Sequence, residues 1–224
     1  MFSSMPSIFL PFLAVFAYII LISPDANAQS ATIDSSIRSF HILHIQGKRY
    51  TVLLTTRGCF ILKGKDTVVR HQGDYFLTMT FKDFDKDGYS DILIERNENT
   101  PNVCDLLLYD PILKSFKEVK DFEDFPNPMP IPKTKLYYSY YASGCADNDW
   151  ASELFYIDHF KAVILGKVHG SACEADLSRS IHIYKATGTK FTLLKALPIS
   201  TVGKYGDKWD FIKHYWFQMY KRFV

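Results

Sequence analysis

The stretch DFDKDGYSD, residues 83–91, carries the strongest structural signal in this chain. Its aspartates stand at nearly alternating positions around one glycine, and carboxylates this close repel one another. Alternating carboxylates on a tight loop can point to one centre, and Ca²⁺ takes about six to eight oxygen ligands. Gly88 permits the sharp reversal that lets a chain wrap an ion. The loop therefore predicts a calcium site with five ligands: Asp83, Asp85, Asp87, the Tyr89 carbonyl and Asp91.

The residues on either side of the loop decide which kind of calcium site this is. Residues 76–81 (FLTMTF) before it and 92–94 (ILI) after it have the composition of strands. An EF-hand needs flanking helices and a bidentate Glu at loop position 12, where this chain has Ile94. The pattern thus predicts a strand, a calcium loop and a strand. The alternative is an acidic surface loop without an ion. Mg²⁺ suits the loop less, because it seldom uses an all-protein cage.

Working outward, the rest of the chain has the pattern of an all-β protein. Short runs of β-branched and aromatic residues alternate with turn residues such as Gln46-Gly47 and Thr187-Gly188. The connector 121–132 contains four prolines and cannot be a central strand. The predicted strands are 39–45, 49–55, 59–62, 67–70, 75–81, 92–96, 104–109, 115–119, 136–143, 151–158, 161–169, 180–186 and 190–195.

A weak internal repeat bears on the architecture. Residues 85–94 and 147–156 each place an Asp-x-Asp loop before a strand, which indicates two related strand–loop–strand units. The alternative is chance likeness between hairpins. Repeated antiparallel meanders are typical of a propeller-like or closed barrel-like arrangement. The second loop, 145–153, lacks the first Asp and the Gly, so we do not expect it to bind calcium alone.

The amino-terminal residues predict export. The apolar run 8–22 precedes Ala26-Asn27-Ala28, which has the form of a signal-peptide cleavage site. An uncleaved anchor is the alternative, although the run is short for a membrane span. We therefore predict a signal peptide over 1–28, a β domain over 29–206 and a periplasmic or extracellular protein after cleavage near Ala28.

The carboxy-terminal segment, 207–224, predicts a short amphipathic helix. Its aromatic face is expected to dock on the β domain. A patch for a partner or a membrane surface is the alternative, and a strand over 211–217 is a lesser one. The predicted apolar face consists of Trp209, Ile212, Trp216, Met219, Tyr220 and Phe223.

Four cysteines after a predicted signal peptide favour disulfides, and four allow three pairings. In an up-down-up meander of 136–143, 151–158 and 161–169, Cys145 and Cys173 lie at the same end. This favours a Cys145–Cys173 disulfide and leaves Cys59 to pair with Cys104. None of them has C-x-x-C spacing, which argues against zinc or redox chemistry.

Composition and motifs narrow the function classes. The formal net charge of +2 and the lack of a Lys/Arg cluster argue against nucleic-acid binding. The chain has no G-x-S-x-G and no H-E-x-x-H motif, and His41 and His44 fall on opposite faces of a strand. We predict no catalytic residues. The alternative is a cell-wall or surface-glycan hydrolase whose acid and base come from the acidic loop.

The acidic loop between two strands resembles the calcium loop of FG-GAP/VCBS-type repeats. The wider stretch is similar to a family of small periplasmic bacterial proteins: residues 81–92, then LLYDP (107–111), K-x-F (114–116) and Ser143-Gly144 before LFY (154–156). That family includes immunity proteins that bind and block cell-wall-degrading toxins. The resemblance implies a calcium-stabilised, propeller-like inhibitor or binding protein. The cysteines and the carboxy-terminal extension depart from the family pattern.

These observations together predict an exported, non-catalytic calcium-binding protein with a protein partner in the cell envelope. A cell-wall hydrolase is one candidate partner. Contact is expected on the loop 144–150 (GCADNDW), where Trp150 would be the anchor and Asp147 and Asp149 would lie beside it. A core role for Trp150, capping the sheet, is the alternative.

Overall fold

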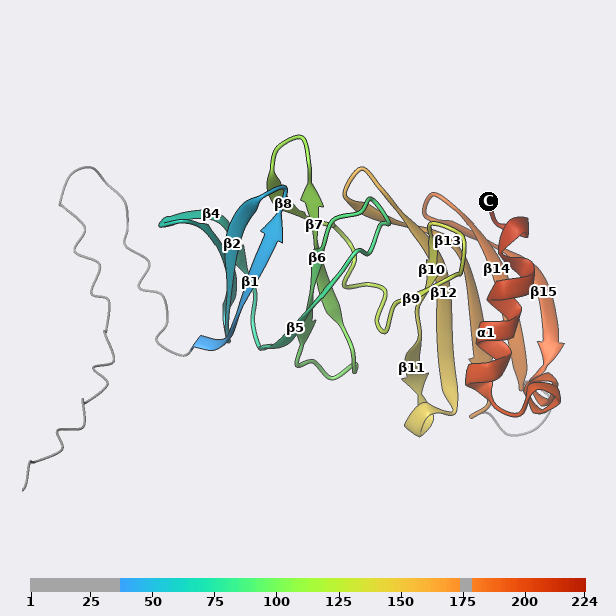
Figure 1. Ribbon diagram of the computed structural model, residues 1–224. Coiled ribbons are helices and arrows are strands. Elements are labelled where there is room, and N and C mark those ends of the chain that lie inside the picture. The colour runs from blue at the N-terminus through green and yellow to red at the C-terminus, as the bar shows by residue number, and fades with distance from the viewer. Residues whose placement is uncertain (1–36, 174–178) are drawn as a thin grey trace, which may run out of the picture. The chain divides into compact units, whose positions relative to one another are not determined.

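Antiparallel strands make up most of residues 37–173 and 179–224, which this computed structural model describes (Figure 1). The predicted signal peptide lies outside the described residues. Within those residues, no helix has both the length and the apolar composition needed to span a membrane.

The first eight strands form two four-stranded meanders, each with its strands in chain order. Within each meander, consecutive strands pair antiparallel. The first sheet contains β1 (Ile37–Ile45), β2 (Lys48–Thr55), β3 (Gly58–Lys63) and β4 (Asp66–Gln72). The second contains β5 (Phe76–Lys82), β6 (Asp91–Arg96), β7 (Cys104–Asp110) and β8 (Ser115–Glu118).

The third sheet has seven strands in the order β15-β14-β13-β12-β10-β9, with β11 also paired to β12. The predicted strand 136–143 is divided at Ser139–Tyr140 into β10 and β11. Pro130 in the connector lies in β9 at the edge of this sheet, where a missing N–H costs no ladder bond. The strands are β9 (Met129–Pro130), β10 (Leu136–Tyr138), β11 (Tyr141–Gly144), β12 (Asp149–Asp158), β13 (Lys161–Ser171), β14 (Ser180–Thr187) and β15 (Lys190–Pro198).

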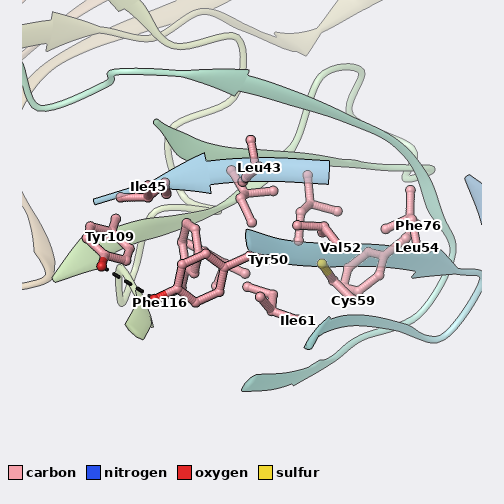
Figure 2. Close-up of a cluster of buried hydrophobic side chains, with 13 residues drawn as sticks. Leu43, Ile45, Tyr50, Val52, Leu54, Cys59, Ile61, Phe76, Tyr109 and Phe116 are labelled. Atoms are coloured by element: carbon pink, nitrogen blue, oxygen red, sulfur yellow. Dashed lines mark hydrogen bonds between the residues drawn. The ribbon is translucent and has the colours of Figure 1, made fainter. Parts of the chain in front are cut away.

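One hydrophobic cluster joins the first two sheets (Figure 2). In β2, Tyr50, Val52 and Leu54 alternate with more exposed residues and are fully buried, as the two-residue period of a strand requires. The Tyr50 and Tyr109 hydroxyls lie 3.5 Å apart, and both rings contact Phe116 edge-on. The two meanders thus share a core.

The proline-rich connector joins this part to the third sheet. Phe122 and Phe125 are buried against Phe155 of β12. The backbone of Lys120 bonds to Phe160 O and Ala162 N, both at 2.9 Å. All described residues therefore belong to one compact unit.

The carboxy-terminal helix docks on the third sheet, but its buried face differs from the predicted one. Helix α1 (Lys208–Met219) follows the 3₁₀ turn η2 (Ile199–Tyr205) and leads into η3 (Tyr220–Arg222). Asp207 caps it by accepting a bond from Asp210 N at 2.9 Å. Its indole and aromatic side chains pack in the sheet's core, where Trp216 Nε1 donates to Ser152 Oγ at 2.8 Å. Four residues of this segment are buried: Phe211, Ile212, Trp216 and Phe223.

The three sheets are open paths among the described strands, so closure into a propeller or barrel stays a prediction.

The predicted Cys59–Cys104 disulfide is wrong, because both residues are free thiols that lie in two different hydrophobic clusters. Burial raises the pKa of each thiol to about 12, so both are protonated near neutral pH.

Candidate functional site

The acidic loop lies between β5 and β6 and is closed by its own carboxylates. Lys86 and Gly88 have left-handed backbone angles, with φ of 63° and 94°. Asp83 accepts bonds from Asp87 N at 3.0 Å and Gly88 N at 3.1 Å. Asp85 accepts from Asp87 N at 3.1 Å, and Asp87 accepts from Tyr89 N at 2.8 Å. The chain therefore folds back around its side-chain oxygens.

Asp91 anchors this loop to the sheet. Its side chain is buried, and one oxygen accepts a bond from Phe84 N at 2.7 Å. The other oxygen accepts from Tyr109 N at 2.9 Å. Asp91, the first residue of β6, thus connects the start of the loop to β7.

Three of the five predicted ligands converge. One carboxylate oxygen from each of Asp83, Asp85 and Asp91 lies within 4.8 Å of the other two. Two ligands of one Ca²⁺ at about 2.3–2.6 Å can be at most about 5.2 Å apart, so this set fits the ion. Asp87 is outside the group, and the Tyr89 hydroxyl accepts a bond from Gln46 Nε2 at 3.0 Å. Ligation by Asp87 and the Tyr89 carbonyl stays a prediction.

Burial and mutual repulsion both disfavour the ionised form of the carboxylates in this loop. Burial raises the pKa of Asp91 to about 7, and repulsion from Asp85 and Asp87 adds to the rise. Its two backbone hydrogen bonds act in the opposite direction. Burial also raises the pKa of Asp85, again with repulsion from Asp87. A divalent cation would offset both effects, because it is the largest local charge wherever it binds.

The loop is also held from the third sheet. The Tyr137 hydroxyl donates to the Phe84 carbonyl, and Lys86 Nζ donates to Thr134 O at 2.6 Å. Phe84 stacks on Tyr137 with ring centroids 4.5 Å apart. The acidic loop is therefore packed against residues at the edge of the third sheet.

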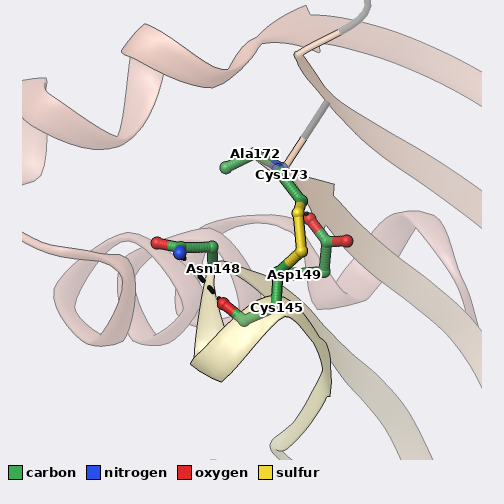
Figure 3. Close-up of a disulfide and its surroundings, with 5 residues drawn as sticks. All are labelled: Cys145, Asn148, Asp149, Ala172 and Cys173. Atoms are coloured by element: carbon green, nitrogen blue, oxygen red, sulfur yellow. Dashed lines mark hydrogen bonds between the residues drawn. A yellow bond between two sulfur atoms is a disulfide. The ribbon is translucent and has the colours of Figure 1, made fainter. Parts of the chain in front are cut away.

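The predicted partner loop has an unusual backbone (Figure 3). Its turn η1 (Cys145–Asp147) places three consecutive non-glycine residues at φ of 50°, 48° and 71°. Such angles are unfavourable for side chains with a Cβ and persist only where the surroundings hold them. A disulfide joins Cys145 to Cys173, as the meander predicts, with Cα atoms 5.9 Å apart. Asn148 Nδ2 donates to Cys145 O at 2.9 Å.

Both acids of this loop are used inside the chain. Asp147 Oδ2 lies 2.5 Å from Lys208 Nζ, and Asp147 Oδ1 accepts a bond from the Tyr140 hydroxyl. Burial alone would raise the pKa of Asp147, but these two partners lower it below its usual range. Asp149 accepts bonds from the backbone N–H groups that follow β13, at 2.8 and 3.0 Å. These bonds lower the pKa of Asp149. Neither carboxylate is a free contact for a partner.

The predicted anchor, Trp150, is a core residue. It is 2 % exposed, and its indole occupies the space above Gly170, where a Cβ would lie only 2.2 Å from Trp150 Cε2. Trp209 is the exposed tryptophan at this loop, at 40 %. It packs on Tyr140, with ring centroids 3.6 Å apart. Helical periodicity predicted that Trp209 faces the core. The prediction is wrong because periodicity does not show how much of the helix face the sheet covers.

Sequence reasoning missed a buried ion cluster between the first two sheets. His71 Nε2 lies 2.8 Å from Asp105 Oδ2, and His71 Nδ1 lies 3.4 Å from Glu118 Oε2. Arg96 Nη1 lies 3.3 Å from the other Asp105 oxygen. Burial by itself lowers the pKa of His71, but the hydrogen bond and charge of Asp105, aided by Glu118, outweigh it and raise the pKa. No local sequence pattern brings these residues together.

This cluster has the residue types of a nucleophilic triad, since Cys59 is the register partner of His71. Its geometry fits a structural role better. Both ring nitrogens of His71 face carboxylates, which leaves neither directed to a thiol. The Cys59 thiol is fully buried and protonated.

Comparisons with known proteins place the chain in no family. No protein-family model and no curated protein matches it. A solved structure of a Xanthomonas type IV secretion system related protein superposes with a TM-score of 0.44 and 13% sequence identity. The match covers 75% of this chain and 86% of that one. Similarity this low establishes neither a shared family nor a shared function.

Proposed function

We propose that this protein is an exported, calcium-stabilised binding protein of the cell envelope that acts without catalysis. The observation that carries the proposal is the convergence of Asp83, Asp85 and Asp91 on a loop that these carboxylates close by accepting backbone N–H bonds. A propeller-like arrangement of the meanders is part of the proposal. Export is supported by the signal-like run and by a disulfide, which persists in oxidising compartments.

Calcium would be held by these three carboxylates, with Asp87 and the Tyr89 carbonyl as further candidates. The ion supplies positive charge that keeps buried carboxylates ionised. Asp91 connects the site to β7, and Tyr137 connects the loop to the third sheet. Binding therefore stabilises the packing of the sheets rather than a surface turn alone.

A melting experiment tests the calcium proposal. Calcium at about 100-fold excess over its dissociation constant should add about 2.7 kcal/mol to the free energy of unfolding. The melting temperature should fall on chelation, and Asp85→Ala should abolish the response to calcium. Asp110→Ala is the matched control, because Asp110 caps a different turn through Ile112 N and Leu113 N. An equal melting temperature with calcium and with chelator would contradict the proposal.

The partner surface in this proposal is the loop 143–148 together with Trp209. A loop fixed by a disulfide and an ion pair loses little conformational entropy on binding. The small side chains of Ser143, Gly144 and Ala146 are exposed, so the backbone can approach a partner closely. This shape suits insertion into the cleft of a protein, and a cell-wall hydrolase remains the candidate.

An activity assay separates binding from catalysis. Purified protein is incubated with peptidoglycan, alone and with lysozyme-like enzymes. We expect no turnover by the protein alone and inhibition of a partner enzyme. Ala146→Trp should weaken inhibition without changing the melting temperature. Trp209→Ala should also weaken inhibition, and it should lower the melting temperature because its indole packs on Tyr140. Phe191→Ala, which removes an exposed aromatic side chain from β15, is the control. Turnover by the protein alone, lost in a folded Asp87→Ala variant that still responds to calcium, would favour the hydrolase.

A further inference from the structure

His169 and His182 are neighbours on the face of the third sheet that points away from the carboxy-terminal helix. His169 of β13 and His182 of β14 are direct register partners in an antiparallel pair. Partners of this kind have Cβ atoms about 4.5–5.5 Å apart and side chains on one face. Their sequence neighbours Val168, Ile181 and Ile183 are buried in the cluster beneath α1. The two imidazoles therefore project together from the opposite face.

The pair is partly ordered by its surroundings. Both histidines are half-buried, and Ser180 Oγ lies 3.3 Å from His182 Nδ1. Burial lowers the pKa of His169, with Lys167 adding to the decrease and Asp149 opposing it; His182 also contributes to the lowering. The neutral imidazole that results at neutral pH is the form that binds metals.

The neighbouring charges permit a cation. Lys167 lies next to His169 on the same face, but its Nζ is 3.1 Å from Glu153 Oε1 and 2.9 Å from the Tyr141 hydroxyl. Its charge is therefore matched by a carboxylate. An open hollow of about 310 Å³, lined by Lys167, His169, Tyr184 and Phe191, lies beside His169. It leaves room for water or a small ligand at the remaining coordination positions.

We propose that His169 and His182 form a surface site for a divalent transition-metal ion. Two imidazoles suit Cu²⁺, Ni²⁺ and Zn²⁺, whereas Ca²⁺ and Mg²⁺ prefer oxygen ligands. Cu²⁺ should bind tightest, as the general order of divalent affinities requires. The site is separate in the chain from the acidic loop and does not depend on the function proposed above.

The test is a titration of untagged protein with Cu²⁺ alone, in excess Ca²⁺ so that any site in the acidic loop is filled. One Cu²⁺ should bind per chain, and its electron paramagnetic resonance spectrum should contain hyperfine coupling to two nitrogens. Removal of a residue that only hydrogen-bonds to a metal ligand lowers metal affinity by about 10–100-fold. His169 and His182 would be direct ligands, so His169→Gln and His182→Gln should each lower Cu²⁺ affinity by at least about tenfold. His159→Gln, whose side chain is 94% exposed, is the matched control.

The outcomes are distinct. Equal Cu²⁺ affinity in the wild type and in either His169→Gln or His182→Gln would overturn the proposal. So would a wild-type spectrum with fewer than two coupled nitrogens, a measurement that does not depend on any variant folding. Failure of the calcium response in the Asp85→Ala experiment bears only on the acidic loop and leaves this site unaffected.

Discussion

The acidic loop at residues 83–91 and the loop at 144–149 begin from similar sequence and are stabilised in different ways. Each places alternating aspartates before a strand, β6 or β12. In the first loop, carboxylates of Asp83, Asp85 and Asp91 converge and no covalent bond closes the turn. In the second, Asp147 and Asp149 bind groups of the same chain and a disulfide completes the closure. An Asp-x-Asp pattern therefore does not define a metal site by itself.

This difference makes the two parts of the molecule sensitive to different conditions. The first two sheets depend on buried ionisable groups: Asp91 in the acidic loop and the His71–Asp105 pair. The partner loop depends on a disulfide and on an ion pair at the surface. Cations and pH should therefore change the stability of the first two sheets, and reductants should change the stability of the partner loop.

The largest effect is expected for Asp91→Ala. The substitution leaves Phe84 N and Tyr109 N without their acceptor. A buried donor without a partner costs about 1–3 kcal/mol, so the variant should lose about 2–6 kcal/mol of unfolding free energy. Asp87→Ala should lose less than about 1 kcal/mol, because its one bond is exposed to water. Chemical denaturation in the presence of a chelator measures both losses without any contribution from calcium. Equal losses in the two variants would show that Asp91 does not anchor the loop.

A loss of about 3.5 kcal/mol, below the upper end of the range for Asp91→Ala, is expected when Cys145 and Cys173 are both replaced by Ser. The disulfide closes a loop with a sequence separation of 28, and loops of this size gain about this much. The calcium response should be retained, since the acidic loop is elsewhere. Thiol titration checks the pairing. Wild-type protein unfolded without reductant should expose two thiols, from Cys59 and Cys104, and four would contradict the structure.

The pH dependence of stability should come from the first two sheets. The folded state raises the pKa of His71, so its protonated form stabilises the fold. That contribution is complete below the unfolded pKa of about 6.5 and is lost as the pH rises through the higher folded value. In calcium-saturated protein, His71→Gln should flatten the fall in melting temperature above this pH, whereas His159→Gln should not. An unchanged slope in His71→Gln would assign the dependence to another group.

The smallest effect is expected for Asp147→Asn. The ion pair with Lys208 is partly exposed, and such pairs are worth about 0–1 kcal/mol. The melting temperature should therefore change little. Binding should weaken more than stability, because the left-handed turn at Cys145–Asp147 loses one of its restraints. Unaltered inhibition by this variant would mean that the disulfide alone holds the loop.

Local patterns were sufficient for the secondary structure and for part of the site. Runs of β-branched and aromatic residues between turn residues predicted strands such as β2, and the aromatic face of the carboxy-terminal segment predicted α1. The acidic loop could be located from Asp83 to Asp91 because its ligands are close in sequence. The Cys145–Cys173 pairing followed from the meander, since an up-down-up path brings those strand ends together.

Contacts between distant segments were decided only by the tertiary structure. The His71–Asp105 pair, the separation of Cys59 from Cys104 and the burial of Trp150 all depend on which face of one sheet meets another element. The exposure of Trp209 and the His169–His182 pairing have the same origin. A strand's pattern says which residues share a face, but the packing of sheets and helix determines what covers that face. The sequence by itself therefore determined the strands and the calcium-like loop, and the tertiary structure decided which polar groups are paired and which aromatic residues reach solvent.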